Sequence, residues 1–123
     1  MNASIPEGLG AVVTGAAGGL GRAFCETLAS ARNRVIVADI NVEAAKQTAD
    51  DIIRAGGEAR AVEVDVSNWD SVSALKDEAV SYLGRVDMLI NNAGVGVVGT
   101  VDGTSQEDWE WIMGINLWGV IYG

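Results

Sequence analysis

Short apolar runs and longer amphipathic stretches follow one another along the chain. Mainly apolar runs lie at 11–13, 35–38 and 86–90, and a run that alternates apolar and polar residues lies at 61–66. Continuous apolar runs are typical of strands buried on both faces of a parallel sheet. Alternation of apolar and polar residues is typical of a strand with one face more exposed to solvent. The pattern therefore predicts four strands, with 61–66 at an edge of the sheet.

Mostly apolar residues at helical spacings of three and four follow each of the first three predicted strands. They are Leu20, Phe24, Thr27, Leu28 and Ala31; then Val42, Ala45, Ala49, Ile52 and Ile53; then Val72, Leu75, Ala79, Tyr82 and Leu83. The second set predicts a helix over 42–55 that turns these residues inward and ends at Gly56-Gly57. Ser67 with Asp70 predicts the cap of the third helix, and Gly84 predicts its end.

Strands that alternate with helices predict right-handed crossovers and a parallel sheet. We expect residues 1–123 to form one domain of the α/β class. It would be a Rossmann-like doubly wound parallel sheet that stops after about four strands, in the order 3-2-1-4, with helices on both faces. In such a sheet the ligand lies at the carboxyl ends of the strands, where the strand order reverses.

A last helix is predicted over 109–122, with Ser105 and Asp108 as its cap. One stripe on it consists of Trp109, Ile112, Met113, Asn116, Leu117 and Val120, and another consists of Trp111, Ile115, Trp118 and Tyr122. A helix that is apolar on almost every face is expected to be buried on almost every face. A four-strand sheet would cover only part of it. We therefore expect further sequence or a partner chain to cover the rest, with a homo-oligomer formed through this helix.

Charge and composition exclude several classes of function. The chain has 8 basic and 17 acidic residues, a net charge of −9, and nucleic acids or anionic membranes would require basic patches. With no histidine and one cysteine there is no ligand set for zinc and no base for Ser-His-Asp chemistry, so no metal is expected. Cys25 is expected to be an inert buried thiol. The lack of a basic leader and of a membrane-length apolar run predicts a cytoplasmic protein.

Four glycines, Gly15, Gly18, Gly19 and Gly21, stand between the first predicted strand and the helix that follows it. The free N–H groups and positive dipole end of a helix attract a phosphate, and glycine lets the backbone approach it closely. Asp39 closes the second apolar run, near the ~20-residue spacing at which an acid can accept hydrogen bonds from an adenine-ribose hydroxyl. Together the two features favour a dinucleotide-binding domain.

The literal G-x-G-x-x-G of the chain lies elsewhere, at Gly94, Gly96 and Gly99. It follows the fourth predicted strand, but residues 100–104 do not open a helix, so no dipole end faces it. We therefore expect 95–103 to be a glycine-rich loop at the carboxyl edge of the sheet, without a phosphate.

Five motifs in order resemble the short-chain dehydrogenase/reductase family. They are Thr14-Gly15-Ala16-Ala17-Gly18-Gly19-Leu20-Gly21, the acid Asp39, the pair Asp65-Val66, Asn91-Asn92-Ala93-Gly94, and Ile115-Asn116-Leu117-Trp118-Gly119. The resemblance covers nearly all of this chain, but only the N-terminal half of a typical member.

The resemblance implies a role for each matching residue. The pyrophosphate would be wrapped by Gly15, Gly19, Leu20 and Gly21. Asp39 would hold the adenosine ribose, and the adenine would be bordered by Asp65 and Val66. The cofactor cleft would be lined by Asn92, Ala93 and Gly94. Asn91 would brace the sheet. Asn116 matches the family's catalytic-site asparagine, which orders a water in a proton relay. The alternative for Asn116 is a polar helix residue bonded to backbone, since an unpaired amide among apolar residues would cost ~1–3 kcal/mol.

Asp39 also bears on the choice of cofactor. A carboxylate repels a 2′-phosphate and bonds a free 2′-hydroxyl, which favours NAD over NADP. Arg22 is expected in solvent and Arg34 in a turn, so neither is expected to neutralise the additional phosphate of NADP.

The resemblance implies hydride transfer between NAD and an alcohol or carbonyl substrate. Family members also use a serine and a Tyr-x-x-x-Lys pair, but Val86 stands four residues after Tyr82, and one residue follows Tyr122. We therefore expect this chain to be the cofactor-binding half, inactive alone. Two alternatives remain. One is a non-enzymatic nucleotide-binding or dimerisation module, and the other is an S-adenosylmethionine-dependent methyltransferase, which the TGxxxGxG and NNAG motifs disfavour.

Overall fold

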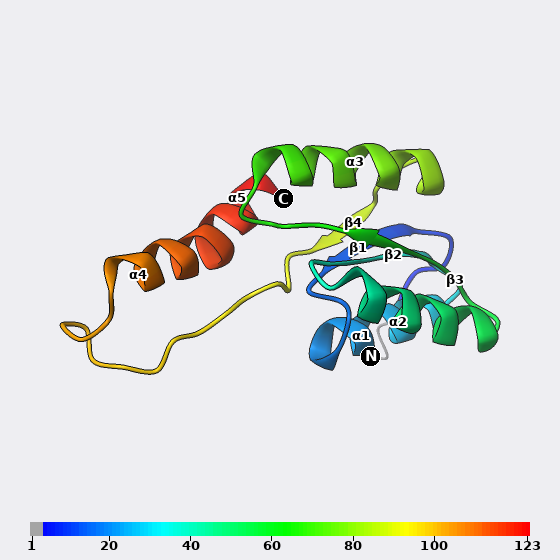
Figure 1. Cartoon of the computed structure of the whole chain (residues 1–123). Coiled ribbons are helices and arrows are strands. Elements are labelled where there is room, and N and C mark those ends of the chain that lie inside the picture. Colours follow the sequence, from blue (N-terminus) through cyan, green and yellow to red (C-terminus); the bar gives the residue numbers. More distant parts are fainter. Residues whose placement is uncertain (1–3) are drawn as a thin grey trace.

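The computed structural model describes residues 4–123, which form a four-stranded parallel sheet in the order β3-β2-β1-β4. The strands are β1 (Gly10–Thr14), β2 (Arg34–Asp39), β3 (Glu58–Glu63) and β4 (Met88–Ile90). The helices between them are α1 (Gly19–Ser30), α2 (Val42–Arg54) and α3 (Trp69–Leu83). Helices α1 and α2 cover one face and α3 covers the other (Figure 1). The predicted fold class and strand order are confirmed.

The two central strands, β1 and β2, have apolar side chains on both faces. Val13, Val35 and Val37 pack with α1 and α2, whereas Val12 and Ile36 pack with α3, and all five are buried. Successive side chains of a strand point to opposite faces, so a continuous apolar run is the sequence of a strand covered on both sides.

The outer strands differ from the prediction in their bounds. β3 begins at Glu58 and ends at Glu63, three residues before the predicted span, because it pairs with β2 along the whole length of that strand. β4 is shorter than predicted, at Met88–Ile90, because it pairs only with residues 11–13 of β1. Apolar content alone does not determine which residues find a partner across the sheet.

Two details of the helices were predicted wrongly. Ser67 does not cap α3, because its hydroxyl donates to the carboxylate of Asp65 at 2.6 Å, and Asn68 accepts from the N–H of Ser71 at 2.9 Å instead. Ile53 was expected to face inward but is 51% exposed. The cap predicted at Ser105 is confirmed, since its hydroxyl accepts from the N–H of Asp108 at 3.1 Å.

The buried face of α1 is made mainly of small residues. Leu20 and Phe24, which helped to indicate the helix, are 72% and 40% exposed, whereas the buried residues are Gly21, Cys25, Leu28 and Ala29. Small side chains let the helix axis approach the sheet closely. Burial raises the pKa of the Cys25 thiol to about 12, which agrees with the inert thiol expected there.

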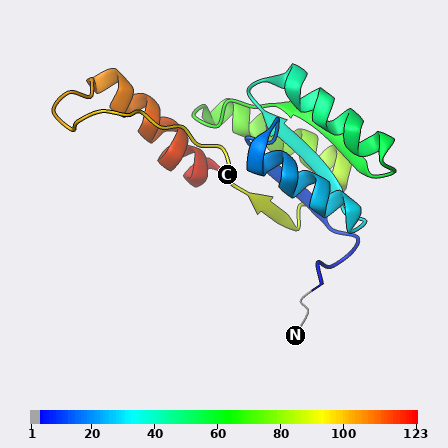
Figure 2. The ribbon, with the colours of Figure 1, turned by 90° about the horizontal axis from the view of Figure 1, so that it is seen from below.

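The last helical segment extends away from the sheet. It runs as α4 (Gln106–Met113), a π-helical turn η1 (Gly114–Trp118) and α5 (Gly119–Tyr122), and the preceding loop and α4 project beyond the sheet edge (Figures 1 and 2). Trp109, Trp111 and Trp118 are 42%, 48% and 48% exposed. The burial expected for this helix is therefore not provided by the described part of this chain, and a covering partner stays a prediction. Within residues 4–123, no helix combines the length and apolar character needed to cross a bilayer.

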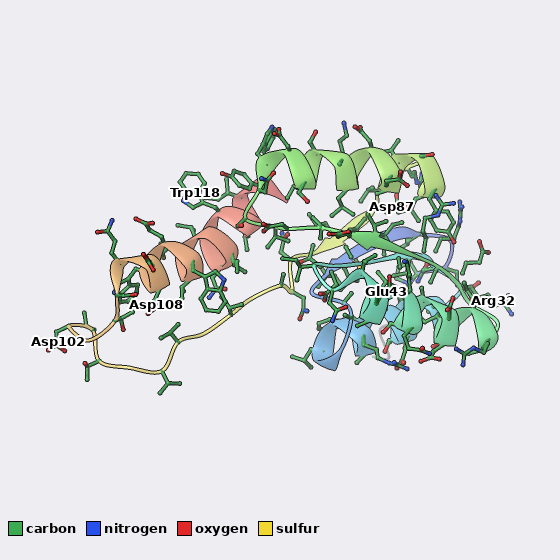
Figure 3. All side chains as sticks on the ribbon, viewed as in Figure 1. Arg32, Glu43, Asp87, Asp102, Asp108 and Trp118 are labelled. Atoms are coloured by element: carbon green, nitrogen blue, oxygen red, sulfur yellow. The ribbon has the colours of Figure 1, made fainter. Side chains whose placement is uncertain are left out.

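Asp87 joins β4 to β1 at the edge opposite the last helix. Its carboxylate accepts from the N–H of Gly10 at 2.9 Å and pairs with Arg85 at 2.8 Å. In Figure 3 it lies far from Asp108 and Trp118 of the last helical segment. The Gly10 N–H, with Arg85 in support, holds the pKa of this carboxyl below its usual value.

The pKa of Asp87 is lower in the folded state than in the unfolded state. Its carboxylate therefore stabilises the fold fully above about pH 5, and this stabilisation is lost as the pH falls through the folded pKa. We expect Asp87→Asn to lower stability at pH 7 and to lose less stability than wild type between about pH 5 and pH 2. Urea unfolding across this range measures both effects. Asp77→Asn is the control, because within residues 4–123 Asp77 pairs with neighbouring Lys76 alone, on the surface. Equal acid sensitivity of wild type and Asp87→Asn would contradict the assignment.

Candidate functional site

A cavity of about 300 Å³ lies at the carboxyl edge of the sheet, beside β1, where the strand order reverses. It is lined by Gly15, Asp39, Ile40, Val64, Asp65, Val66, Asn92, Ala93, Gly94, Val95 and Ile115. The structure thus brings together residues that follow all four strands. Gly19, Leu20 and Gly21 do not line this cavity but open α1 directly after the same glycine turn.

Close backbone packing requires glycine at two positions of this turn. Gly15 has a φ of +61°, and a Cβ there would lie 2.8 Å from the Cα of Ala93. A Cβ at Gly21 would overlap the carbonyl oxygen of Gly15 and lie 2.7 Å from the side-chain nitrogen of Asn92. The turn, the start of α1 and the segment after β4 are therefore in direct contact, as only glycine allows.

The amino terminus of α1 lacks the side-chain cap that the other helices of the sheet have. Asn41 and Asn68 accept from backbone N–H groups at the starts of α2 and α3, but Gly18 offers α1 no side chain, and the first turn of α1 contains no acid. Among the described residues, the N–H groups of Gly19, Leu20 and Gly21 have no hydrogen-bond partner.

The outer surface of this turn is also open. A Cβ added at Gly18 or Gly19 would meet no atom within 4 Å. Free donors, the positive end of a helix dipole and open space above them fit an anionic diphosphate.

Asp39 ends β2 and faces the same cavity. One carboxylate oxygen accepts from the N–H of Ala17 at 3.0 Å and the other from the N–H of Asn41 at 2.9 Å. Each carboxylate oxygen can accept a further hydrogen bond. Asp39 therefore orders the glycine turn and retains acceptor capacity for hydroxyl groups in the cavity.

Asp65 and Val66 form another part of the cavity wall. One oxygen of Asp65 accepts from both the N–H and the hydroxyl of Ser67, at 3.0 and 2.6 Å, which fixes the turn after β3. The side chain of Val66 packs with α3 and against Gly119. A Cβ added at Gly119 would lie 3.1 Å from the Cβ of Val66.

Asn92 ties the end of β4 to the end of β1. Its side-chain amide donates to the carbonyl oxygens of Thr14 and Gly15, both at 3.0 Å. The hydroxyl of buried Thr14 accepts from the N–H groups of Asn92 and Ala93, each at 3.1 Å. The brace expected of Asn91 is therefore made by Asn92, because its side chain is the one that points to β1. The bracing hydroxyl of Thr14 was missed, although its place just before the glycines was the available signal.

Asn116 lies in the π-helical turn and bonds to backbone. Its side-chain oxygen accepts from the N–H of Val95 at 2.8 Å, and its side-chain nitrogen donates to the carbonyl oxygen of Val95 at 2.7 Å. π-Helical turns recur at functional sites. In this chain the amide of Asn116 holds a residue of the cavity wall, and its role in a proton relay stays a prediction.

The two arginines considered for NADP are bound elsewhere. Arg22 was expected in solvent, and its side chain is 36% exposed, but it also pairs with Asp51 at 2.8 Å and with Glu26 at 2.7 Å. Arg34 was expected in a turn, but it begins β2, and its guanidinium donates to carbonyl oxygens at the end of α3. Neither arginine lines the cavity.

The chain is similar to known proteins over almost its whole length. Residues 10–123 match the family model described as short chain dehydrogenase. The 7alpha-hydroxysteroid dehydrogenase of Escherichia coli K12 is 44% identical over 73% of this chain and 35% of its own length. The meso-2,3-butanediol dehydrogenase of Serratia marcescens is 39% identical over 90% of this chain and 43% of its own length.

Solved structures agree with this match. A short chain dehydrogenase/reductase from Burkholderia phymatum in complex with NAD has a TM-score of 0.93 and 44% identity, over 95% of this chain and 42% of that chain. The hydroxysteroid dehydrogenase from Escherichia coli has a TM-score of 0.90 and 37% identity, over 94% of this chain and 49% of that chain. The chain thus spans less than half the length of these relatives.

Gly21→Ala tests the close packing at the turn. We expect it to destabilise the fold by about 1–3 kcal/mol, because backbone atoms must shift to admit the methyl group. Gly18→Ala is the matched control, since its Cβ would face open space, and it should change stability by less than about 0.5 kcal/mol. Thermal and urea unfolding of both variants measure the difference. Equal stabilities would show that the turn tolerates a side chain at Gly21.

Asn116→Leu tests the clamp on the cavity wall. The variant keeps a similar volume but loses both hydrogen bonds to Val95, so we expect faster amide exchange at Val95, by about tenfold or more. Asn91→Leu is the control, because no hydrogen bond of the Asn91 side chain is found in residues 4–123. Unchanged exchange at Val95 in Asn116→Leu would contradict the clamp.

Proposed function

The chain belongs to the short-chain dehydrogenase/reductase family, and we propose that it is the cofactor-binding part of an NAD-dependent oxidoreductase. One juxtaposition carries this proposal. The uncapped start of α1 offers the N–H groups of Gly19, Leu20 and Gly21, and Asp39 stands on the other side of the same turn, bonded to it through Ala17. Donors for a diphosphate and acceptors for a ribose are thereby adjacent.

The other cavity residues fit the remaining parts of a dinucleotide. In our proposal Gly15, Gly19, Leu20 and Gly21 hold the diphosphate, Asp39 the adenosine ribose, and Asp65 and Val66 the adenine, while Asn92, Ala93 and Gly94 line the rest of the cleft. A bound nicotinamide supplies hydride acceptor or donor chemistry. The contribution of this chain is to bind and orient that cofactor.

NAD is the proposed cofactor rather than NADP. The carboxylate of Asp39 would repel a 2′-phosphate, and Arg22 is already paired with Asp51 and Glu26. A solved relative with 44% identity was crystallised with NAD, which supports the same choice.

The substrate class is an alcohol or carbonyl compound. Relatives described as hydroxysteroid and butanediol dehydrogenases support this class, but not one substrate within it. We propose that Asn116 serves the proton relay of the complete enzyme, and that this chain alone does not turn over, because it has no Tyr-x-x-x-Lys pair. The family match weighs against an S-adenosylmethionine-dependent methyltransferase.

A second candidate, a non-enzymatic nucleotide-binding or dimerisation module, is favoured by the last helical segment. Its tryptophans Trp109, Trp111 and Trp118 are about half exposed, an unusual amount of apolar surface for one short segment. Light scattering over a range of concentrations tests association directly. A chain that binds NAD and associates, but shows no alcohol or carbonyl turnover even when joined to the C-terminal half of a family member, would support this module over the oxidoreductase.

Asp39→Ala tests the cofactor assignment. It removes a charged acceptor, so we expect NAD affinity to fall by about tenfold or more, and the ratio of NAD to NADP affinity to fall with it. Calorimetric titration with both dinucleotides provides the two constants. Asp50→Ala makes the same charge change on the exposed face of α2 and should leave both affinities unchanged. An undiminished NAD affinity in Asp39→Ala would refute the proposed role of Asp39.

A further inference from the structure

Helix α2 contacts the glycine turn through one buried hydroxyl. Thr48 has no exposed surface, and its hydroxyl donates to the carbonyl oxygen of Ala17 at 3.1 Å, across 31 residues of sequence. A threonine within a helix commonly donates back to its own helix. Thr27 of α1 does so, donating to the carbonyl oxygen of Ala23 at 2.7 Å. Thr48 instead bonds outward, to the turn after β1.

The same residue of the turn is held from a second direction. The N–H of Ala17 donates to the carboxylate of Asp39 at 3.0 Å, so both polar backbone groups of Ala17 are fixed by side chains from β2 and α2. The N–H of Ala16 donates to the carbonyl oxygen of Ala38 at 3.1 Å. Gly18 follows in an extended conformation, with φ −165° and ψ −176°, before α1 begins.

The Ala17 carbonyl is the acceptor that one more residue at the start of α1 would use. In an α-helix a carbonyl accepts from the N–H four residues later, which for Ala17 is the N–H of Gly21. In this structure the Ala17 carbonyl accepts from Thr48 instead, and the first N–H of α1 with a partner is that of Arg22, bonded to Gly18 at 3.2 Å. Among the described residues the N–H of Gly21, a buried residue of α1, has no partner.

We propose that Thr48 is a positioning residue of the diphosphate site: its hydroxyl holds the Ala17 carbonyl away from α1, so that the Gly21 N–H stays available to the anion. This inference rests on the proposed function, because it assumes that the ligand of the turn is a diphosphate. Thr48 does not touch the cofactor in this account, and it acts through the turn alone.

Thr48→Val, which replaces the hydroxyl by a methyl of similar size, is the main test. In the variant the Ala17 carbonyl is free to accept from Gly21. We expect NAD and ADP to bind about fivefold more weakly and adenosine to bind within about twofold of wild type, because only the first two place a diphosphate on the turn. Thr48→Ser keeps the hydroxyl and should restore NAD affinity. Thr27→Val makes the same substitution in α1 and should leave all three affinities unchanged.

Amide hydrogen exchange in the unliganded protein gives a second readout that does not depend on any ligand. We expect the Gly21 amide to exchange more slowly in Thr48→Val than in wild type, since it gains a partner, and to return to the wild-type rate in Thr48→Ser. Unchanged NAD and ADP affinities, or an equal loss for adenosine, would overturn the inference. Wild type that fails to bind NAD would overturn the proposed function, and the exchange rates of Gly21 would still decide whether Thr48 sets the turn.

Discussion

Backbone lies directly against backbone where β1 ends, and the arrangement of the carboxyl edge depends on this contact. Gly15 lies too close to Ala93 for a side chain to fit, and Gly21 lies too close to Gly15. Both glycines also lie against the side-chain amide of Asn92. The amide of Asn92 then bonds the carbonyl oxygens that the turn exposes. Strand order, turn and helix start are thus fixed together, because a shift in any one of them would leave buried polar groups unpaired.

An anion site on an acidic chain must rely on local dipoles. The net charge of −9 opposes the approach of a dinucleotide, and the arginine nearest to the turn is already paired with Asp51 and Glu26. What remains is a helix start whose N–H groups have no side-chain cap, with open space beside Gly18 and Gly19. Such fixed donors need no reorganisation when an anion binds, and their effect is confined to the first turn of the helix.

The two sides of the molecule differ in how completely they are covered. Around β1 and β2 apolar side chains are buried on both faces, whereas β4 and the last helical segment expose Leu89, Trp111 and Trp118 to a third or more of their area. The covered side is the one that holds the proposed diphosphate and ribose positions. The uncovered side includes the last helical segment, and this chain spans less than half of the proteins it matches.

The sequence by itself determined the α/β class, the strand order and most of the residues that line the cavity, but not Ile40, Val64, Val95 or Ile115. Apolar runs, helical spacing and the glycine turn are local patterns that few folds satisfy together. It also indicated Asp39 and the motif of Asn92, because both lie at the carboxyl ends of strands that meet at the same edge.

Only the tertiary structure decided which atoms meet at that edge. Local spacing placed β3 three residues late, turned Ile53 inward and assigned the brace to Asn91. All three were wrong because strand pairing, helix rotation and side-chain bonds depend on residues distant in sequence. No pattern in the sequence indicated a role for Thr48, because that role also depends on a residue distant in sequence. Its partner, the Ala17 carbonyl, lies 31 residues away in sequence, and a hydroxyl in a helix acquires a role only from what the fold places beside it.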